Sequence, residues 1–134
     1  MTVDTNVLVR AVMQDDPAQA SAAAQQLSAA ETIAITLPTL CEFVWVLLRV
    51  YKLRPCDIAE ALQALVAAVN VKVNRAGVEA GLAMLSAGGD FADGVIAFEG
   101  QWLGGEIFVS FDKKAVTLLS AQGKPARLLD AGKH

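Results

Sequence analysis

Short segments that favour β-strand alternate along this chain with longer segments that favour helix. The strand-like segments are mostly apolar and cover residues 1–4, 32–37, 71–73, 107–109 and 126–129. Strands that alternate with helices usually pair in parallel, because the helix returns the chain to the same end of the sheet. The pattern therefore predicts an α/β fold in which helices cover both faces of a parallel sheet.

The intervening segments carry residues that mark the starts and stops of helices. Asp16 and Pro17 fit the N-cap and the first position of a helix, and the glycine pairs at 88–89 and 104–105 fit helix ends. Between residues 58 and 69, apolar residues recur at helical spacing. We expect one helix around that stripe, and others over residues 16–30, 38–51, 74–85, 90–103 and 112–122.

The size of the chain fits one domain with a substantial core, so we expect a single domain over residues 1–134. Hydrophobic residues make up 54% of the chain, and we expect part of this apolar surface to be buried against a partner. No apolar stretch long enough to span a membrane escapes interruption by charge or proline, and no signal peptide precedes the first strand. We therefore expect a cytoplasmic protein without membrane association, and Cys41 and Cys56 fit reduced thiols.

Two features of the composition limit the kinds of catalysis and ligand binding that the chain can support. The only histidine is the last residue, which argues against histidine-based catalysis and histidine-bound zinc. The formal net charge is −3, which argues against a broad basic surface that binds nucleic acid without metal. If cations neutralised four carboxylates, the rest of the chain would be slightly basic, so a nucleic-acid substrate stays compatible with the charge.

Two acidic residues stand at the expected ends of strands. Asp4 ends the first strand, and Asp112 comes just after the strand over residues 107–109. In open α/β sheets, ligands bind beyond the carboxyl ends of the strands. We expect Asp4 and Asp112 to lie at this edge.

Two further acids lie in helical segments. Glu42 is the only charge in a strongly apolar helix before Arg49, and a buried carboxylate requires either a metal ion or a partner such as Arg49. Asp93 shares a helix face with Ala97 and Gly100, and small residues on that face would bring the helix close to the sheet. We expect Glu42 and Asp93 to converge with the acids at the strand ends.

Each of these positions also has a purely structural explanation. An aspartate at a strand end often starts an Asx turn, which would account for Asp4, and Asn6 fits either that turn or a site. Asp90 and Asp93 together fit the start of a helix, and Asp112 fits an N-cap. For Asp90 we favour the helix cap.

A cluster of four carboxylates would bind divalent cations. Neighbouring carboxylates raise one another's pKa unless a cation neutralises them. Oxygen ligands without His or Cys favour Mg²⁺ or Mn²⁺, and the natural chemistry of such a site is hydrolysis of a phosphodiester. Lys113 and Lys114 fall in the first turn of a helix, where the helix dipole disfavours cations, which agrees with anions nearby. A pair of solvated surface lysines is the more common explanation of such residues.

Four motifs occur in a defined order. They are Val-Asp-Thr-Asn-Val-Leu at residues 3–8, a glutamate in an apolar helix, Gly-Asp-Phe-Ala-Asp-Gly-Val-Ile-Ala at 89–97 and Ser-Phe-Asp-Lys-Lys-Ala at 110–115. This order resembles the PIN domains of the VapC toxin type, over essentially the whole chain. The resemblance implies a PIN-like fold with a parallel sheet of about five strands and a metal-dependent ribonuclease. One departure is Gly94, where the family often has alanine.

The resemblance also implies roles for particular residues. It makes four acids the catalytic and metal-binding residues, namely Asp4, Glu42, Asp93 and Asp112. Of these, Asp4 and Asp93 would be the chief Mg²⁺ ligands, and Asp90 would be a fifth contributor. Asn6 and Ser110 match polar positions that support the site.

The family usually occurs in toxin–antitoxin pairs, which implies a small antitoxin protein bound near the site and a homodimer. The helices between residues 38 and 69 fit either the dimer surface or the antitoxin groove. Basic residues that would bind the RNA substrate are Arg10, Arg49, Lys113 and Lys114.

Two other classes of protein place acids on a similar sheet. A phosphatase of the haloacid dehalogenase type needs a second aspartate two residues after the first, where this chain has Asn6. A receiver-like signalling domain needs a phosphate-accepting aspartate after a central strand, but Asn74 follows the strand over residues 71–73. A PIN-like module that binds without catalysis is the third alternative.

Overall fold

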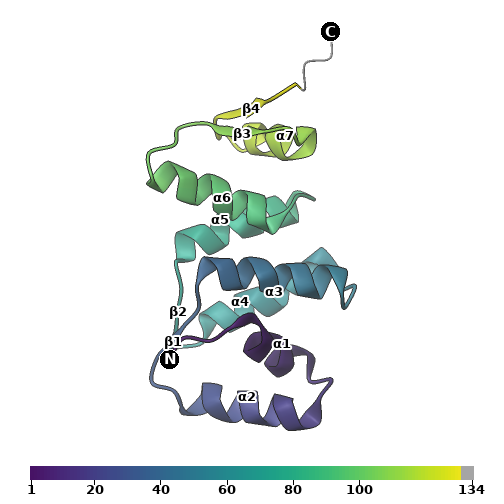
Figure 1. Cartoon of the computed structure of the whole chain (residues 1–134), viewed down its shortest axis with the longest axis vertical. Coiled ribbons are helices and arrows are strands. Elements are labelled where there is room, and N and C mark those ends of the chain that lie inside the picture. The colour runs from purple at the N-terminus through teal and green to yellow at the C-terminus, as the bar shows by residue number, and fades with distance from the viewer. Residues whose placement is uncertain (131–134) are drawn as a thin grey trace. The chain divides into compact units, whose positions relative to one another are not determined.

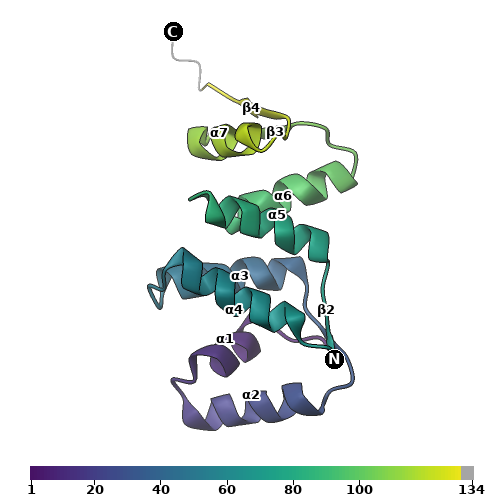
Figure 2. The same cartoon turned by 180° about the vertical axis from the view of Figure 1, so that it is seen from behind.

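The structure, a computed structural model, describes residues 1–130 and divides into two compact units (Figures 1 and 2). The first unit is Met1–Asn74, and the second begins at Arg75. The expected single domain stays a prediction, and the only histidine, at position 134, lies outside the described residues.

The first unit consists of four helices and a pair of short strands. The helices are α1 (Thr5–Met13), α2 (Pro17–Ala29), α3 (Leu37–Arg49) and α4 (Pro55–Ala67), and the strands are β1 (Ile33–Ala34) and β2 (Val71–Lys72). Helix α1 packs against both α2 and α3, and α3 packs against α4. The strands pair in parallel at one end of these helices, with Ile33 opposite Val71 (Figure 1).

Polar side chains begin two of these helices, and the cap at Asp16 was predicted, whereas the cap at Thr36 was not. The Asp16 carboxylate accepts a hydrogen bond from the backbone N–H of Gln19 at 3.2 Å, and Pro17 follows as the first helical residue. The Thr36 hydroxyl accepts one from the N–H of Thr39 at 3.3 Å. Helices α2 and α3 are therefore confirmed, with α3 beginning one residue earlier than expected.

Helix α1 was not predicted. The run of valines around Leu8 favours strand, but the Asp4 carboxylate accepts a hydrogen bond from the N–H of Val7 at 3.1 Å and caps a helix. Residues 1–4 form no regular strand, and Thr2 makes only a single parallel bridge to Ala34. The predicted first strand is therefore reduced to one bridge, followed at once by a helix.

The second unit combines a helix pair with a small sheet. Its elements are α5 (Arg75–Ser86), α6 (Phe91–Trp102), β3 (Phe108–Ser110), α7 (Lys113–Ala121) and β4 (Ala126–Leu128). Helices α5 and α6 lie side by side, and α7 packs on the parallel pair β3–β4 (Figures 1 and 2). Met84, Ala97 and Leu119 form a core that joins α5, α6 and α7.

Glycine allows α5 and α6 to approach closely. A Cβ atom at Gly94 would clash with the backbone carbonyl of Ala80, and one at Gly81 would lie 2.5 Å from the ring of Phe91. The departure at Gly94 from the alanine often found in the family therefore has a steric reason. The predicted contact through Gly100 is wrong, because nothing lies within 4 Å of a Cβ atom built there.

The strands lie close to the predicted segments, but the predicted sheet of five strands is not shown. Within residues 1–130 the strands form two separate parallel pairs, β1 with β2 and β3 with β4. Each strand is only two or three residues long, so little backbone is available for further pairing. No helix in the described part of the chain is long and apolar enough to cross a membrane.

Candidate active site

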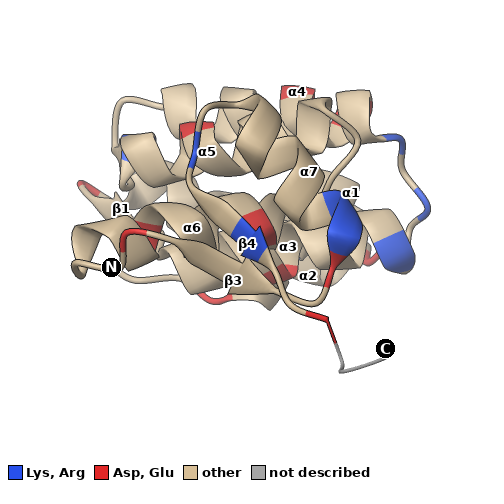
Figure 3. Cartoon of the chain, turned by 90° about the horizontal axis from the view of Figure 1, so that it is seen from above, with Lys and Arg blue, Asp and Glu red and all other residues tan. Residues whose placement is uncertain are grey.

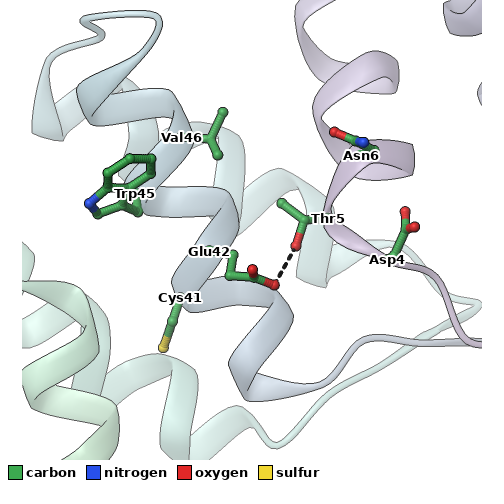
Figure 4. A pocket seen from close by; sticks show the side chains of 7 residues that line it. All are labelled: Asp4, Thr5, Asn6, Cys41, Glu42, Trp45 and Val46. Atoms are coloured by element: carbon green, nitrogen blue, oxygen red, sulfur yellow. Dashed lines mark hydrogen bonds between the residues drawn. The ribbon is translucent and has the colours of Figure 1, made fainter.

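Two of the predicted acids line one pocket in the first unit (Figure 4). The pocket has a volume of about 650 Å³ and lies between the start of α1 and the first half of α3. Helix α1 and its cap contribute Asp4, Thr5 and Asn6, and α3 contributes Cys41, Glu42, Trp45 and Val46. Residues that stand 37 positions apart in sequence thus face the same space.

Asp4 is the N-cap of α1 and is exposed to solvent. Its Oδ1 atom accepts the hydrogen bond from Val7, which fixes the position of the carboxylate in the lining of the pocket. A carboxylate has about four acceptor positions. The cap engages one of them, so Asp4 keeps the capacity to bind a cation.

Glu42 is exposed, so the prediction that it is a buried acid is wrong. Helix α3 buries other positions, including Phe43 and Leu47, and leaves Glu42 on the side that faces α1. The hydroxyl of Thr5 donates a hydrogen bond to Glu42 Oε1 at 2.9 Å (Figure 4). Neither ion pair of the described residues involves Glu42, which also removes the alternative of a pair with Arg49.

Three aspartates interact within the second unit. Asp93 lies in the first turn of α6 and is half-buried. Burial raises the pKa of Asp93, and the nearby charges of Asp90 and Asp112 raise it further. Asp90 and Asp112 thus act electrostatically on Asp93, and the predicted convergence of the four site acids stays a prediction.

The neighbours of Asp93 both cap helices. Asp90 accepts a hydrogen bond from the N–H of Ala92 at 3.0 Å, and Asp112 accepts one from the N–H of Lys114 at 3.0 Å. The predicted capping roles of both acids are confirmed. Ser110 accepts a hydrogen bond from the backbone N–H of Asp112 at 2.9 Å, which holds the turn between β3 and α7.

The chain matches the model of the PIN domain over residues 1–118. It belongs to the PIN domain family. The PIN domain is an α/β, metal-dependent nuclease fold, and its members typically bind divalent cations such as Mg²⁺. All four acids of the predicted quartet lie within the matched range. A search of curated proteins found no match.

The donor chemistry of this PIN domain fits a divalent cation. Every candidate ligand is a carboxylate oxygen, which suits Mg²⁺. Burial and the charges of Asp90 and Asp112 raise the pKa of Asp93 and so disfavour its charged form, which a bound cation would stabilise. Within the described residues, no three His, Cys, Asp or Glu side chains are gathered in a geometry that would hold a metal ion.

The predicted substrate-binding residues differ in their surroundings. Arg10 forms an ion pair with Asp15, with Nη1 and Oδ1 3.2 Å apart, and the hydroxyl of Tyr51 donates to Asp15 Oδ2 at 2.7 Å. The hydrogen bond from Tyr51 lowers the pKa of Asp15, and the charge of Arg10 adds to this effect. Arg10 therefore has a structural role at the turn between α1 and α2.

Three other predicted basic residues are exposed. Arg49, Lys113 and Lys114 form no ion pair with another described residue. Most of the ribbon is uncharged (Figure 3), so these cations stand among few others. They are free to bind an external anion. Sequence reasoning missed Thr5 and Trp45, because neither residue belongs to an acidic or basic motif.

Proposed function

We propose that this PIN domain is a metal-dependent endoribonuclease of the VapC type and acts as the toxin of a toxin–antitoxin pair. The observation that carries the proposal is the half-buried carboxylate of Asp93 in a chain that belongs to a nuclease family. Burial and the charges of Asp90 and Asp112 raise the pKa of Asp93, and a bound cation would offset this cost.

Four carboxylates, those of Asp4, Glu42, Asp93 and Asp112, are the proposed ligands of Mg²⁺ or Mn²⁺, with Asp90 as a further contributor. The proposal treats residues 1–134 as one functional domain, because the family match runs through both compact units. When bound, the cation supplies charge neutralisation at the scissile phosphate and lowers the pKa of the attacking water.

The chain's own residues orient the acids. Thr5 holds Glu42 through its hydroxyl, and the backbone of α1 holds Asp4 through the N-cap. In the second unit, Ser110 holds the turn that presents Asp112. Because these contacts are formed before substrate binds, the acids lose little conformational freedom on binding a cation. Asn6 lines the same pocket and offers an amide donor to a phosphate oxygen.

RNA is the proposed substrate, and exposed cations support its binding. Arg49, Lys113 and Lys114 are placed to contact phosphates outside the cleavage point, and each contact of this kind is weakened by salt. We assign Arg10 a lesser part, since its guanidinium is engaged by Asp15. The cytoplasm, where RNA is available, is the proposed location.

A small antitoxin and a second copy of the chain are the proposed protein partners. Large apolar side chains are exposed in both units, and exposed apolar surface of this kind often marks protein contacts. The most exposed are Val50, Val69, Trp102, Leu103 and Phe111.

The test is cleavage of a mixed RNA pool by antitoxin-free protein. We expect cleavage in Mg²⁺ or Mn²⁺, none in EDTA, and a loss of about 100-fold or more for Asp4→Asn and for Asp93→Asn. Glu60→Gln, an exposed acid on α4 with no proposed role, is the matched control and keeps full activity. Cleavage that persists in EDTA, or in both aspartate variants, would contradict the proposal.

A further inference from the structure

Trp45 places a large aromatic ring on the surface of the first unit. The core-facing side of α3 is fully buried, as at Phe43 and Leu47, whereas Trp45 is 58% exposed. Tryptophan is highly buried on average, and an exposed one is typical of binding surfaces. The packing of this unit therefore does not account for the indole.

The exposed ring belongs to the pocket that holds two of the proposed catalytic acids. Trp45 follows Glu42 by three residues on α3, a spacing at which Cβ atoms are about 5–6 Å apart. Trp45 and Cys41 lie along one side of α3, whereas Glu42 faces Thr5 (Figure 4). The pocket thus has an apolar side next to an acidic one.

We propose that Trp45 stacks on an unpaired base that flanks the scissile phosphate of the RNA substrate. The inference rests on the proposed function and adds a specificity-determining residue to it. Single-stranded nucleic acids are held by aromatic side chains that stack on successive bases. Trp45 would therefore select single-stranded RNA, because a paired base keeps its face inside the duplex.

The charge of the pocket favours an uncharged base over an acidic peptide as the group that stacks on Trp45. Asp4 and Glu42 line the same space and repel an acidic peptide. A base carries no charge, so it stacks beside these carboxylates without electrostatic cost. Its neighbouring phosphate would then lie towards the acids, where the cation neutralises it.

Tryptophan fluorescence tests the contact directly, because the chain has only two tryptophans. Trp102 is 75% exposed on α6 and lies outside the pocket, which makes it the matched control. The full chain carrying Trp102→Phe reports Trp45 alone, and Trp45→Phe reports Trp102 alone. We titrate each with a single-stranded RNA oligonucleotide in Ca²⁺ and check on a denaturing gel that the RNA stays intact.

We expect the RNA to quench Trp45 and to leave Trp102 unchanged. Trp45→Ala should weaken binding of the oligonucleotide about 10-fold, and Trp45→Phe should retain most of the affinity. An oligonucleotide of the same length without bases carries the same charge and should not quench Trp45. Wild type and Trp45→Ala should bind this base-free oligonucleotide with the same affinity.

Equal quenching by the base-free oligonucleotide, or unchanged affinity in Trp45→Ala, would overturn the stacking contact. So would loss of a dimer in Trp45→Ala, measured by size-exclusion chromatography, together with no quenching of Trp45 by RNA in Trp102→Phe. These results leave metal-dependent cleavage by the wild type intact, so they are distinguishable from failure of the proposed nuclease. Quenching of Trp45 without cleavage would keep the stacking contact and remove the nuclease.

Discussion

The two units of the molecule hold their acidic residues in different ways. In the first unit, Asp4 and Glu42 are exposed and each accepts a hydrogen bond, from Val7 and Thr5 respectively. In the second unit, Asp93 is half-buried beside two other acids, and its pKa is raised. The acids of the first unit contribute to its stability, whereas Asp93 opposes the stability of its own unit when it is charged.

This difference between the units separates acids that local structure explains from acids that indicate a binding site. A cap or a hydrogen bond is a sufficient reason for an acid at Asp4 or Glu42, so neither position alone indicates function. Asp93 lies in the first turn of α6, where the helix dipole favours an acid, but burial and the charges of Asp90 and Asp112 raise its pKa all the same. A carboxylate that costs stability is the stronger indication of a binding site.

The largest effect on stability should come from the packing that positions Asp93. Gly94→Ala places a Cβ atom against the carbonyl of Ala80, so α6 must move away from α5. We expect a loss of about 1–3 kcal/mol in the free energy of unfolding, measured with urea. Gly100→Ala, in the same helix but in open space, should gain about 0.5–1 kcal/mol. Equal effects of the two substitutions would contradict the close approach.

The cap at Asp4 predicts the next largest effect. Asp4→Ala removes the acceptor for the N–H of Val7 and should cost about 1 kcal/mol in the free energy of unfolding. Asp4→Asn keeps a good capping side chain and should leave stability nearly unchanged while removing the charge. If both variants lost the same stability, the carboxylate charge rather than the cap would be the stabilising feature.

A smaller effect is expected at Thr5. Thr5→Val keeps the shape of the side chain and removes the hydrogen bond to Glu42, which lies at the surface. We expect a loss of about 0.5 kcal/mol in urea denaturation, the lower end for a hydrogen bond. Thr117→Val, at an exposed position of α7, is the control and should change stability less. RNA cleavage by Thr5→Val should also fall, since Glu42 loses the contact that orients it.

The smallest change in stability is expected at Asp93, where substitution should stabilise the protein instead of destabilising it. Asp93 has a raised pKa in the folded state, so the folded protein binds more protons than the unfolded one in that pH range and loses stability as pH rises. In EDTA at neutral pH, Asp93→Asn should therefore melt at a higher temperature than wild type. The difference should vanish at a pH below the ordinary pKa of aspartate.

Asp57 provides a control of the opposite kind for this experiment. Its carboxylate accepts a hydrogen bond from Arg54 at 2.9 Å, which lowers the pKa of Asp57. The stability that follows from this lowered pKa is present above the ordinary pKa of aspartate. It is lost as the pH falls through the lowered pKa of Asp57. Asp57→Asn should therefore melt no higher than wild type at neutral pH. A destabilised Asp93→Asn would contradict the comparison between the units.

Much of the fold was predictable because its signals are local. Caps such as Asp16 and Asp112 act within three residues, and the sequence placed their helices nearly correctly. Helix α1 was missed because its valines favour strand, and the cap at Asp4 outweighs this preference. The five-stranded sheet was overpredicted, since apolar segments do not reveal which strands pair.

The candidate site was predictable to a similar degree. The order of the motifs selected the acids, and their role as one site stays a prediction, although Asp90 and Asp112 both raise the pKa of Asp93. The exposure of Glu42 was not foreseen, because an apolar sequence does not say which face of the helix is buried. Thr5 and Trp45 carry no charge, and only the three-dimensional pocket brings them to notice.

Calorimetric titration of the full chain with Mn²⁺ tests the central claim most directly. The claim is that this PIN domain binds a divalent cation through the acids named in the proposed function. Wild type and Glu60→Gln should bind alike, and Asp4→Asn and Asp93→Asn should each weaken binding about 10-fold or more. If Asp4→Asn bound Mn²⁺ as tightly as wild type, Asp4 would be a helix cap alone, and the acids of the second unit would account for the metal site.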